Sequence, residues 1–298
     1  MENLRAKITL PYQAHNGMAM DVYYPEEPRA DNVCVLCLHD GVFADGSKDD
    51  EPQLKTIEAL IRKGFIVISI EYTLYMQKYR EKIKGMIKPW FYLRFSKYFR
   101  MSLMFAVVDC AMAIDCIYYC AEELEIDSSK IVLLGSSAGG IIALETDCQR
   151  TSVFQRIVPY NWKPLAVIAF AGAITDSSLY GDRSMPAPTL LVHGMKDKTV
   201  RFRYTLLSWI HNGLCGSDIV RERILKAGGK CRSIWFRDAG HEVSKFVPEM
   251  VDEITDFIND VIEEKRINEV EYRDCDPQMK LRRSKDKSIF GLVREKLQ

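Results

Sequence analysis

The chain has 298 residues, of which 47% are hydrophobic and 28% are charged, and this composition is that of an ordinary soluble globular protein. Its 41 Lys and Arg residues balance its 41 Asp and Glu residues, so the overall charge gives no reason to expect a nucleic acid as partner. The length favours one large domain, because a single hydrophobic core seldom serves a longer chain.

The chain begins with MENLRAKITLPYQ, which lacks the apolar stretch of a signal peptide, and no apolar run is expected to span a membrane. The nine cysteines are scattered and odd in number, which favours reduced thiols and a cytoplasmic location. Cys34 and Cys37 form a C-x-x-C pair on a predicted strand, where the two side chains face opposite sides. We therefore expect no metal and no organic cofactor.

Short apolar runs alternate with helical patterns along the chain. Strands are predicted at 33–38, 65–71, 131–135, 166–170, 189–193 and 233–236. Helices are predicted at 104–124, 141–148, 200–211 and 247–262. This alternation is typical of an α/β protein with a mostly parallel central sheet flanked by helices on both faces.

The segment 75–105 stands out from this pattern, because Lys and Arg residues are interleaved there with aromatic residues. Three interpretations are open. The segment forms a lid that lines an aromatic pocket, with Trp90 and Phe91 as candidate substrate-binding residues. Alternatively, it is a plain amphipathic helix packed on the domain, or a patch that makes weak contact with an anionic membrane surface.

The strand at 131–135 runs into Gly135-Ser136-Ser137-Ala138-Gly139-Gly140, and an apolar helical run follows. This strand–turn–helix context is what a G-x-S-x-G nucleophile elbow requires. The turn exposes the Ser137 hydroxyl above the sheet and places the Ala138 amide at a helix N-terminus, where negative charge is favoured. The alternative is a glycine-rich turn with an incidental serine, so suitable partners must be found elsewhere in the chain.

A serine hydroxyl needs a neighbouring base, and the base needs a carboxylate that orients it. The strand at 189–193 is followed by a polar loop that contains Asp197. Asp197 is the candidate acid, although an Asp at this place could instead cap the next predicted helix. Asp238 and Glu242 are rival carboxylates, but both lie too close in sequence to the candidate base to reach round its ring.

The candidate base is His241, which lies in the polar loop FRDAGHEVSKF between the last predicted strand and the last predicted helix. His211 is the other possibility, but it ends the helix predicted at 200–211, where a cation is favourable in any case. We therefore predict a catalytic triad of Ser137, Asp197 and His241.

The strand at 33–38 runs into His39-Asp40-Gly41-Val42, which resembles the HGGG-type loop of esterases and lipases with one glycine left. The resemblance implies that the backbone amides of Gly41 and Val42 join that of Ala138 in an oxyanion hole. Asp40 departs from the pattern and leaves open which amide donates, because a carboxylate near an oxyanion is unfavourable unless it points away.

As an ordered set, these segments resemble the α/β-hydrolase fold, and within it the esterase and lipase group that includes hormone-sensitive-lipase-like enzymes and acetyl and feruloyl esterases. The resemblance covers about residues 5–262 and rests on MAMDVYYP, LHDGVFADGSK, GFIVISIEYTL, VVDCAMAIDCI, IDSSKIVLLGSSAGG, TLLVHGMKDKTV and DAGHEVS. EYTL departs from the D-Y-R-L form that is common in these enzymes, because Thr73 stands where arginine is usual.

The resemblance implies one catalytic domain at 1–262, with 75–105 as a cap insertion between a core strand and a core helix. The rest, 263–298, is a basic extension that we expect to be a solvated appendage without catalytic residues; an extra packed helix or an association segment is also open. Asp109 and Asp115 lie on the helix predicted at 104–124, and we expect them to support a loop or to be solvated.

These features predict a serine hydrolase that cleaves a small-molecule carboxylic ester through an acyl-enzyme. One alternative is a serine peptidase similar to prolyl oligopeptidases, which usually carry an N-terminal propeller that this chain does not contain. The other is a non-catalytic protein of the same fold that binds a small apolar ligand or a protein partner. No feature of the sequence specifies the acyl group, the alcohol or the oligomeric state.

Overall fold

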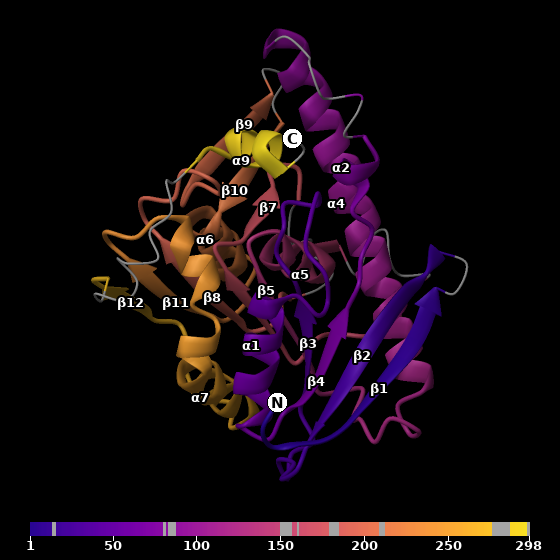
Figure 1. Ribbon diagram of the computed structural model, residues 1–298. Coiled ribbons are helices and arrows are strands. Elements are labelled where there is room, and N and C mark those ends of the chain that lie inside the picture. The colour runs from indigo at the N-terminus through magenta and orange to yellow at the C-terminus, as the bar shows by residue number, and fades with distance from the viewer. Residues whose placement is uncertain are drawn as a thin grey trace.

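The computed structural model of the chain shows a twisted central sheet between two layers of helices (Figure 1). It describes residues 1–13, 16–79, 82, 88–149, 157–159, 161–178, 185–208, 212–275 and 287–296. The side chains of residues 88–93, 208, 212 and 294 lie outside this description.

Within the described residues, the central sheet has nine strands in the order β1-β2-β4-β3-β5-β6-β8-β11-β12. Their bounds are β1 (Leu4–Gln13), β2 (Met18–Pro25), β3 (Cys34–Leu38), β4 (Ile66–Ile70), β5 (Ile131–Ser136), β6 (Ala166–Phe170), β8 (Thr189–Gly194), β11 (Cys231–Phe236) and β12 (Val270–Arg273). β2 pairs antiparallel with both β1 and β4, and all later neighbours are parallel. The prediction of a mostly parallel sheet in an α/β-hydrolase fold is confirmed.

Helices cover both faces of the sheet. They are α1 (Glu51–Ile61), α2 (Tyr75–Lys78), α4 (Lys88–Tyr119), α5 (Ala138–Gln149), α6 (Ser217–Lys226), α7 (Val251–Ile262) and α9 (Ile289–Lys296). The apolar sides of α1 and α7 pack on one face, and those of α4, α5 and α6 pack on the other. The strands β3, β4 and β6 are buried along their whole length, and their residues are mostly apolar, as expected for strands with both faces covered. Cys34 belongs to one core and Cys37 to the other, as the strand prediction implies.

The segment 75–105 has no boundary at its C-terminal end, because α4 runs without interruption from Lys88 to Tyr119. Within α4, the stretch Arg94–Tyr119 is long and apolar enough to cross a membrane by length and composition, so the expectation that no run has this property is wrong. In the structure, 56% of its most apolar window is buried. The helix contacts α5, β1 and β9, so its apolar character is used in the core of the domain.

A second, three-stranded sheet lies beyond the central one, in the order β7 (Ala173–Thr175), β10 (Asn212–Gly216) and β9 (Tyr204–Ser208). The prediction of a helix at 200–211 is therefore wrong. Burial alternates along β9: Thr205 and Leu207 are 6% and 1% exposed, whereas Tyr204 and Leu206 are 37% and 52% exposed. This period of two is typical of a strand with one buried face.

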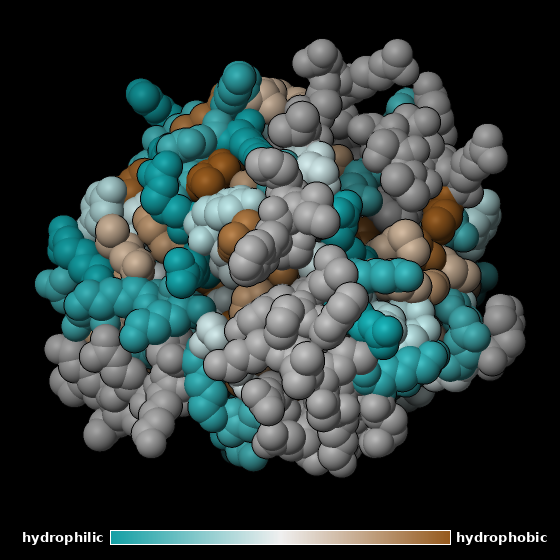
Figure 2. All heavy atoms as spheres, turned by 90° about the horizontal axis from the view of Figure 1, so that it is seen from above, coloured by the Kyte–Doolittle hydropathy of each residue, from teal (hydrophilic) through white to brown (hydrophobic). Residues whose placement is uncertain are grey.

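The described parts of the segment after 262, residues 263–275 and 287–296, are part of the fold and not an appendage. β12 extends the central sheet by pairing with β11. Ile289 and Val293 of α9 are 2% and 0% exposed and join the main core. The expectation of a solvated tail is thus wrong for both elements, and the sheet continues past the boundary predicted at 262. Seen from above, the end of the molecule that carries α9 and β9 shows hydrophobic side chains in small patches between hydrophilic ones (Figure 2).

Candidate active site

Ser137 lies between β5 and α5, in the sharp turn that its sequence context predicts. Its φ angle is +51°, a left-handed value that a non-glycine residue keeps only when its surroundings enforce it. Gly139 is required beside it, because a Cβ there would lie 2.0 Å from the carbonyl oxygen of Leu38 on β3. The turn presents the serine hydroxyl at the carboxyl edge of the sheet, where only 4% of the residue is exposed.

His241 follows β11 and begins the short 3-10 helix η2 (His241–Lys245). Its Nε2 atom lies 2.9 Å from Ser137 Oγ, and its Nδ1 atom lies 2.7 Å from Asp197 Oδ2. Because an ionised carboxylate can only accept a hydrogen bond, Nδ1 carries the ring proton and Nε2 can accept the serine proton. The structure thus brings the three residues of the predicted triad within hydrogen-bond distance, in the order serine, histidine, aspartate.

Asp197 lies in the loop after β8, and its side chain is fully buried. Its Oδ1 atom accepts hydrogen bonds from the backbone N–H groups of Thr199 at 2.7 Å and Val200 at 2.9 Å. One oxygen therefore caps the turn that follows, and the other faces His241. The two interpretations that the sequence left open for Asp197, a cap and an orienting acid, are compatible with each other.

Backbone hydrogen bonds join the loop after β8, which contains Asp197 (the acid loop), to the loop after β11, which contains His241 (the histidine loop). Met195 N–H donates to Phe236 O at 2.9 Å, and Lys196 N–H donates to Ala239 O at 2.8 Å. Because the two loops are fixed to each other, the distance between Asp197 and His241 does not depend on the side chains alone.

His193, at the end of β8, is a buried neighbour of Asp197 that the sequence interpretation missed. Its Nε2–H donates to Val200 O at 2.9 Å and also faces Asp197 Oδ2 at 3.4 Å. The Ser217 hydroxyl lies 2.7 Å from His193 Nδ1 and can donate to it. A histidine four residues before the candidate acid, at the end of the same strand, is the sequence signal that points to it.

The charge of Asp197 is stabilised by these neighbours. Burial alone raises the pKa of this carboxyl, but the facing imidazoles of His241 and His193 outweigh that effect and hold the pKa below its ordinary value. Asp197 therefore stays ionised over the pH range in which a histidine acts as a base.

The rival residues occupy other positions. Asp238 Oδ1 accepts from Cys275 N–H at 2.8 Å, and Glu242 Oε1 accepts from Gly240 N–H at 3.0 Å. Both carboxylates thus shape the loop around His241. His211 lies outside the described residues.

The loop after β3 has the backbone of a strained turn. Gly41 has a φ of +121°, and a Cβ there would lie 1.8 Å from Asp45 O. Val42 and Phe43 follow with φ angles of +57° and +60°, which are unusual for non-glycine residues and especially for a β-branched one. Ala138, the third predicted oxyanion donor, is the first residue of α5, and amides in the first turn of a helix have no partner within the helix.

Phe43 and Tyr72 pack together beneath this loop. The ring of Phe43 meets that of Tyr72 at 6.3 Å and that of Phe99 on α4 at 5.3 Å, both edge to face. The Tyr72 hydroxyl donates to His39 O at 2.9 Å, and its ring stacks on the His39 imidazole at 4.0 Å. These contacts hold the loop after β3 against the core of the domain.

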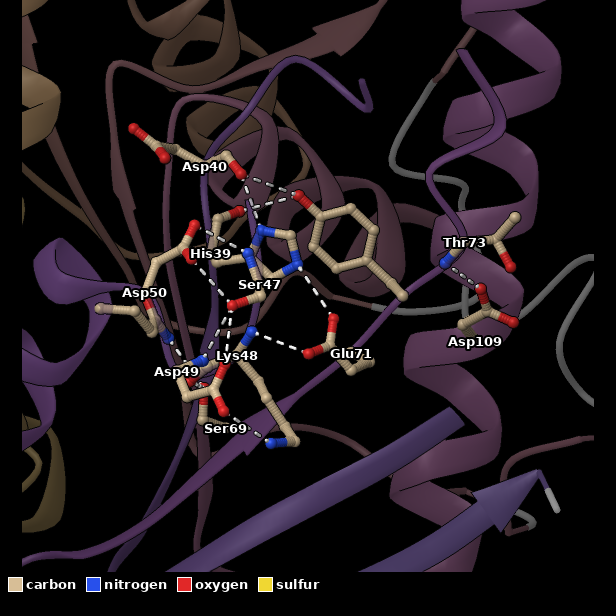
Figure 3. A network of polar contacts seen from close by, with 12 residues as sticks. His39, Asp40, Ser47, Lys48, Asp49, Asp50, Ser69, Glu71, Thr73 and Asp109 are labelled. Carbon is tan, nitrogen blue, oxygen red and sulfur yellow. Dashed lines mark hydrogen bonds and ion pairs between the residues drawn. The ribbon is translucent and has the colours of Figure 1, made fainter. Parts of the chain in front are cut away.

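Figure 3 shows the polar surroundings of His39 and Asp40. His39 Nδ1–H donates to Asp40 O at 2.7 Å, and burial lowers the pKa of His39, so its ring is neutral. The Asp40 carboxylate points away from the His39 ring (Figure 3). It lines a cavity of about 450 Å³ together with Lys55, Arg62 and Lys245.

Asp109 supports the loop that contains the departure EYTL. Its Oδ2 atom accepts from Thr73 N–H at 2.7 Å, as Figure 3 shows, and its Oδ1 atom accepts from Gln13 Nε2 at 2.9 Å. Of the two roles expected for Asp109, the structure shows loop support, since the residue is 4% exposed.

The side chains of Trp90 and Phe91 lie outside the described part of the structure, so their predicted contacts with a substrate stay a prediction. Among the described residues, no group of three or more His, Cys, Asp or Glu side chains is placed to hold a metal ion. All nine cysteines lie in the described residues, and none of them forms a disulfide.

The profile of the BD-FAE family matches residues 20–84, which include β2, β3, β4 and the strained loop at Gly41. No curated protein matches the chain in sequence. Among solved structures, the chain is similar to MGS-M1, an α/β hydrolase enzyme from a Medee basin deep-sea metagenome library, with 14% identity, a TM-score of 0.59 and coverage of 88% of this chain and 100% of that chain.

Two further solved structures show the same relationship. An arylesterase has 16% identity and a TM-score of 0.59 over 86% of this chain and 85% of its own. Thermogutta terrifontis esterase 2 phosphonylated by sarin has 18% identity and a TM-score of 0.60 over 87% of this chain and 95% of its own. These structural matches establish the fold, and the profile match adds a similarity of residues 20–84 to the BD-FAE family. The chain thus has the α/β-hydrolase fold, and its residues 20–84 are similar to the BD-FAE family.

Proposed function

We propose that this protein hydrolyses carboxylic esters through an acyl-enzyme on Ser137. The observation that supports this most is the continuous hydrogen-bonded series from Ser137 Oγ through His241 to Asp197, with distances of 2.9 Å and 2.7 Å. A serine becomes an effective nucleophile only when a positioned base removes its proton.

In the first step, Ser137 Oγ attacks the ester carbonyl carbon while His241 Nε2 takes the hydroxyl proton. Asp197 holds the Nδ1–H tautomer and stabilises the imidazolium that forms, without itself being protonated. The ionised state of Asp197 favours this role, because its neighbours lower the pKa of its carboxyl.

The carbonyl oxygen gains negative charge in this step and needs donors already in place. The Ala138 amide at the start of α5 supplies one, and the amides of Gly41 and Val42 supply the others. The positive φ angles at Val42 and Phe43 support this assignment, because strained backbone concentrates where a site is preorganised.

His241 then gives its proton to the leaving alcohol, and the acyl group stays on Ser137. A water molecule, deprotonated by the same Nε2 atom, attacks the acyl-enzyme and releases the acid. The chemistry is complete with residues of this chain.

Two other functions were open from the sequence. A non-catalytic hydrolase-fold protein has no need of a strained oxyanion loop or of an aligned serine, histidine and aspartate, so the enzyme is favoured. A serine peptidase could use the same triad, but the BD-FAE match favours an ester.

A fluorophosphonate probe tests the proposed nucleophile. Thermogutta terrifontis esterase 2, a structural relative, is described as phosphonylated by sarin, so an organophosphorus reagent is a suitable choice. We expect one covalent adduct on the wild-type protein, located on Ser137 by peptide mass spectrometry and absent from Ser137→Ala. His241→Ala should label far more slowly, and His211→Ala should label like the wild type. Labelling that persists in Ser137→Ala overturns the assignment.

We also propose that the protein acts in the cytoplasm, a proposal supported by nine cysteines that form no disulfide. Cell fractionation followed by immunodetection tests it. Recovery of the protein with the membrane fraction contradicts the proposal and favours the membrane contact that the sequence left open for 75–105.

A further inference from the structure

The C-terminal helix α9 returns to the carboxyl end of the central sheet and lies beside α4, at a distance from the preceding strand β12 (Figure 1). Just before the helix begins, Lys287 O accepts a hydrogen bond from Thr199 Oγ1 at 2.5 Å. Thr199 is also the residue whose amide donates to Asp197. The start of α9 is therefore fixed to the acid loop.

The other end of α9 reaches the loop that carries Gly41. Lys296 forms an ion pair with Asp45, and the Lys296 ammonium lowers the pKa of the Asp45 carboxyl. The backbone of Asp45 closes the same turn, because Asp45 N–H donates to Gly41 O at 3.1 Å. α9 thus connects the acid loop to the loop after β3 that contains Gly41 and Val42 (the oxyanion loop). The two loops are far apart in sequence.

A row of aromatic rings joins the first turn of α9 to the loop that carries Gly41. The ring of Phe290 lies 4.7 Å from that of Phe95 on α4. Phe95 packs on Phe99 at 5.8 Å, and Phe99 meets Phe43 edge to face at 5.3 Å. Phe95, Phe99 and Phe43 are each 0% exposed. A displacement of α9 would therefore also displace Phe43, because the rings between them are close-packed.

The oxyanion loop has a strained backbone, so it needs stabilising contacts from other parts of the chain. Left-handed backbone at Val42 and Phe43 is energetically unfavourable and persists only where the surrounding packing enforces it. Tyr72 packs against Phe43 from one side, and Phe99 packs against it from another. Phe99 belongs to the row that ends on α9.

We propose that α9 is a positioning element of the active site, which holds the oxyanion loop in its reactive conformation through Phe290 and, more weakly, through Lys296. The inference rests on the proposed function and assigns Phe290 as a residue that acts through Phe43 without touching the substrate. Lys296 is the weaker contact because the ion pair is solvent-exposed, with 43% and 53% of the two side chains accessible, and exposed pairs contribute little.

The expected size of the effect follows from oxyanion chemistry. Loss of one oxyanion donor lowers kcat by about 10²- to 10³-fold. A loop that is loosened but still present should lose less, so we expect Phe290→Ala to lower kcat by about tenfold and Lys296→Gln by about twofold. KM should change little, because the oxyanion exists only in the transition state.

The experiment compares wild type, Phe290→Ala, Lys296→Gln and Lys287→Gln with p-nitrophenyl acetate, and it counts reactive sites by fluorophosphonate titration. Lys287→Gln is the matched control, because its side chain pairs with Glu295 on the same helix and its carbonyl oxygen is unchanged. Expressing kcat per reactive site removes any loss of folded protein. Phe290→Leu replaces Phe290→Ala if the latter does not fold.

The proposal predicts a lower kcat per reactive site for both test variants, slower fluorophosphonate labelling and no change for Lys287→Gln. It is overturned if the test variants lose only thermal stability and keep the wild-type kcat per reactive site. It is also overturned if KM alone rises, since that result assigns α9 to substrate binding. Failure of the wild type to label or to hydrolyse any ester would instead contradict the proposed function, so the two failures are distinguishable.

Discussion

Ser137 and Val42 both have left-handed backbone angles, +51° and +57°, although neither is glycine. Both lie on the carboxyl side of a central strand, and the proposed reaction needs a hydroxyl from one and an amide from the other. The fold keeps them in place through local contacts: Ser137 N–H donates to Phe170 O at 2.8 Å, and Val42 is 6% exposed. Strain on both sides of the reacting carbonyl is what a preorganised site requires.

His193 gives a prediction at the same scale. His193→Phe removes an N–H that faces the buried charge of Asp197, and hydrogen bonds to charged groups are worth about 1.5–3 kcal/mol. We expect kcat/KM to fall about tenfold and the acid limb of its pH profile to move to higher pH, because a less shared carboxylate stabilises the His241 imidazolium more strongly. Steady-state kinetics at several pH values measure both.

His193→Gln is the conservative variant for this test, because its amide can still donate toward Val200 O. It should recover part of the activity and of the pH profile. If His193→Phe lowers the melting temperature but leaves the acid limb unchanged, His193 is only a packing residue.

The pH dependence of the wild type follows from the charge of Asp197. The pKa of its carboxyl is lowered in the folded protein. Asp197 is therefore ionised at every pH at which a free Asp is ionised, and it becomes protonated only below the ordinary pKa of Asp. His241 is then the only group of the triad that titrates on the acid side. We expect log kcat/KM to fall with unit slope below about pH 6.5, the ordinary value for histidine, or slightly above it.

A pH profile of kcat/KM between pH 5 and 8, with one ester at fixed ionic strength, measures this dependence. A flat profile argues against a histidine base. A slope of two would mean that a second group, which the structure does not place in the triad, also has to lose a proton.

At the scale of elements, the loop after β3 is the most constrained. Gly41→Ala should lower kcat at least about a hundredfold, because the added Cβ would lie 1.8 Å from Asp45 O and must displace the loop and its donors. Gly17→Ala is the matched control: Gly17 also has a positive φ, +67°, but nothing lies within 4 Å of the added Cβ. Gly17→Ala should lower the free energy of unfolding by only about 1 kcal/mol. If Gly41→Ala keeps the wild-type kcat, this loop does not form part of the oxyanion hole.

The N-terminal part of α4 carries the second prediction at this scale. We expect Trp90→Ala or Phe91→Ala to change the ranking among p-nitrophenyl esters of graded chain length, mostly through KM, because remote apolar contacts bind ground state and transition state alike. Tyr118→Ala, an exposed aromatic that is 46% accessible near the far end of the same helix, is the control. Identical chain-length profiles for all variants would return this segment to a plain packing role.

Several elements could be predicted from the sequence because their signals are local. The turn at Ser137 needs small residues in a fixed order, and Asp197 and His241 each follow a short aliphatic strand. The strand β9 was mistaken for a helix, because 200–211 has apolar residues at both helical and alternating spacings. Its pairing with β10 decided the outcome, and strand pairing is a long-range contact that periodicity does not show.

At the scale of the whole molecule, the part that could not be predicted is the return of the chain after β12. The local signal for α9 is Ile289, Phe290, Leu292 and Val293, four apolar residues at helical spacing in a basic tail. Nothing in that pattern says which surface they cover. The contacts with Phe95, Thr199 and Asp45 exist only because the completed fold brings those segments to the same end of the sheet.

The position of α9 also changes how the domain is divided. A catalytic domain that ended at 262 would lack the ninth strand of the sheet and the helix that contacts both the acid loop and the loop at Gly41. Substitutions in α9 that remove its contacts with Phe95 or Asp45 are therefore expected to affect catalysis, although they lie far from Ser137 in sequence.

The most direct test of the account is the hydrolysis of p-nitrophenyl acetate by wild type and Ser137→Ala, with circular dichroism to confirm that both are folded. The account predicts measurable turnover by the wild type and a loss of at least about a thousandfold in kcat for Ser137→Ala, as expected for the nucleophile of a triad. A folded Ser137→Ala protein that hydrolyses the ester at the wild-type rate would contradict it.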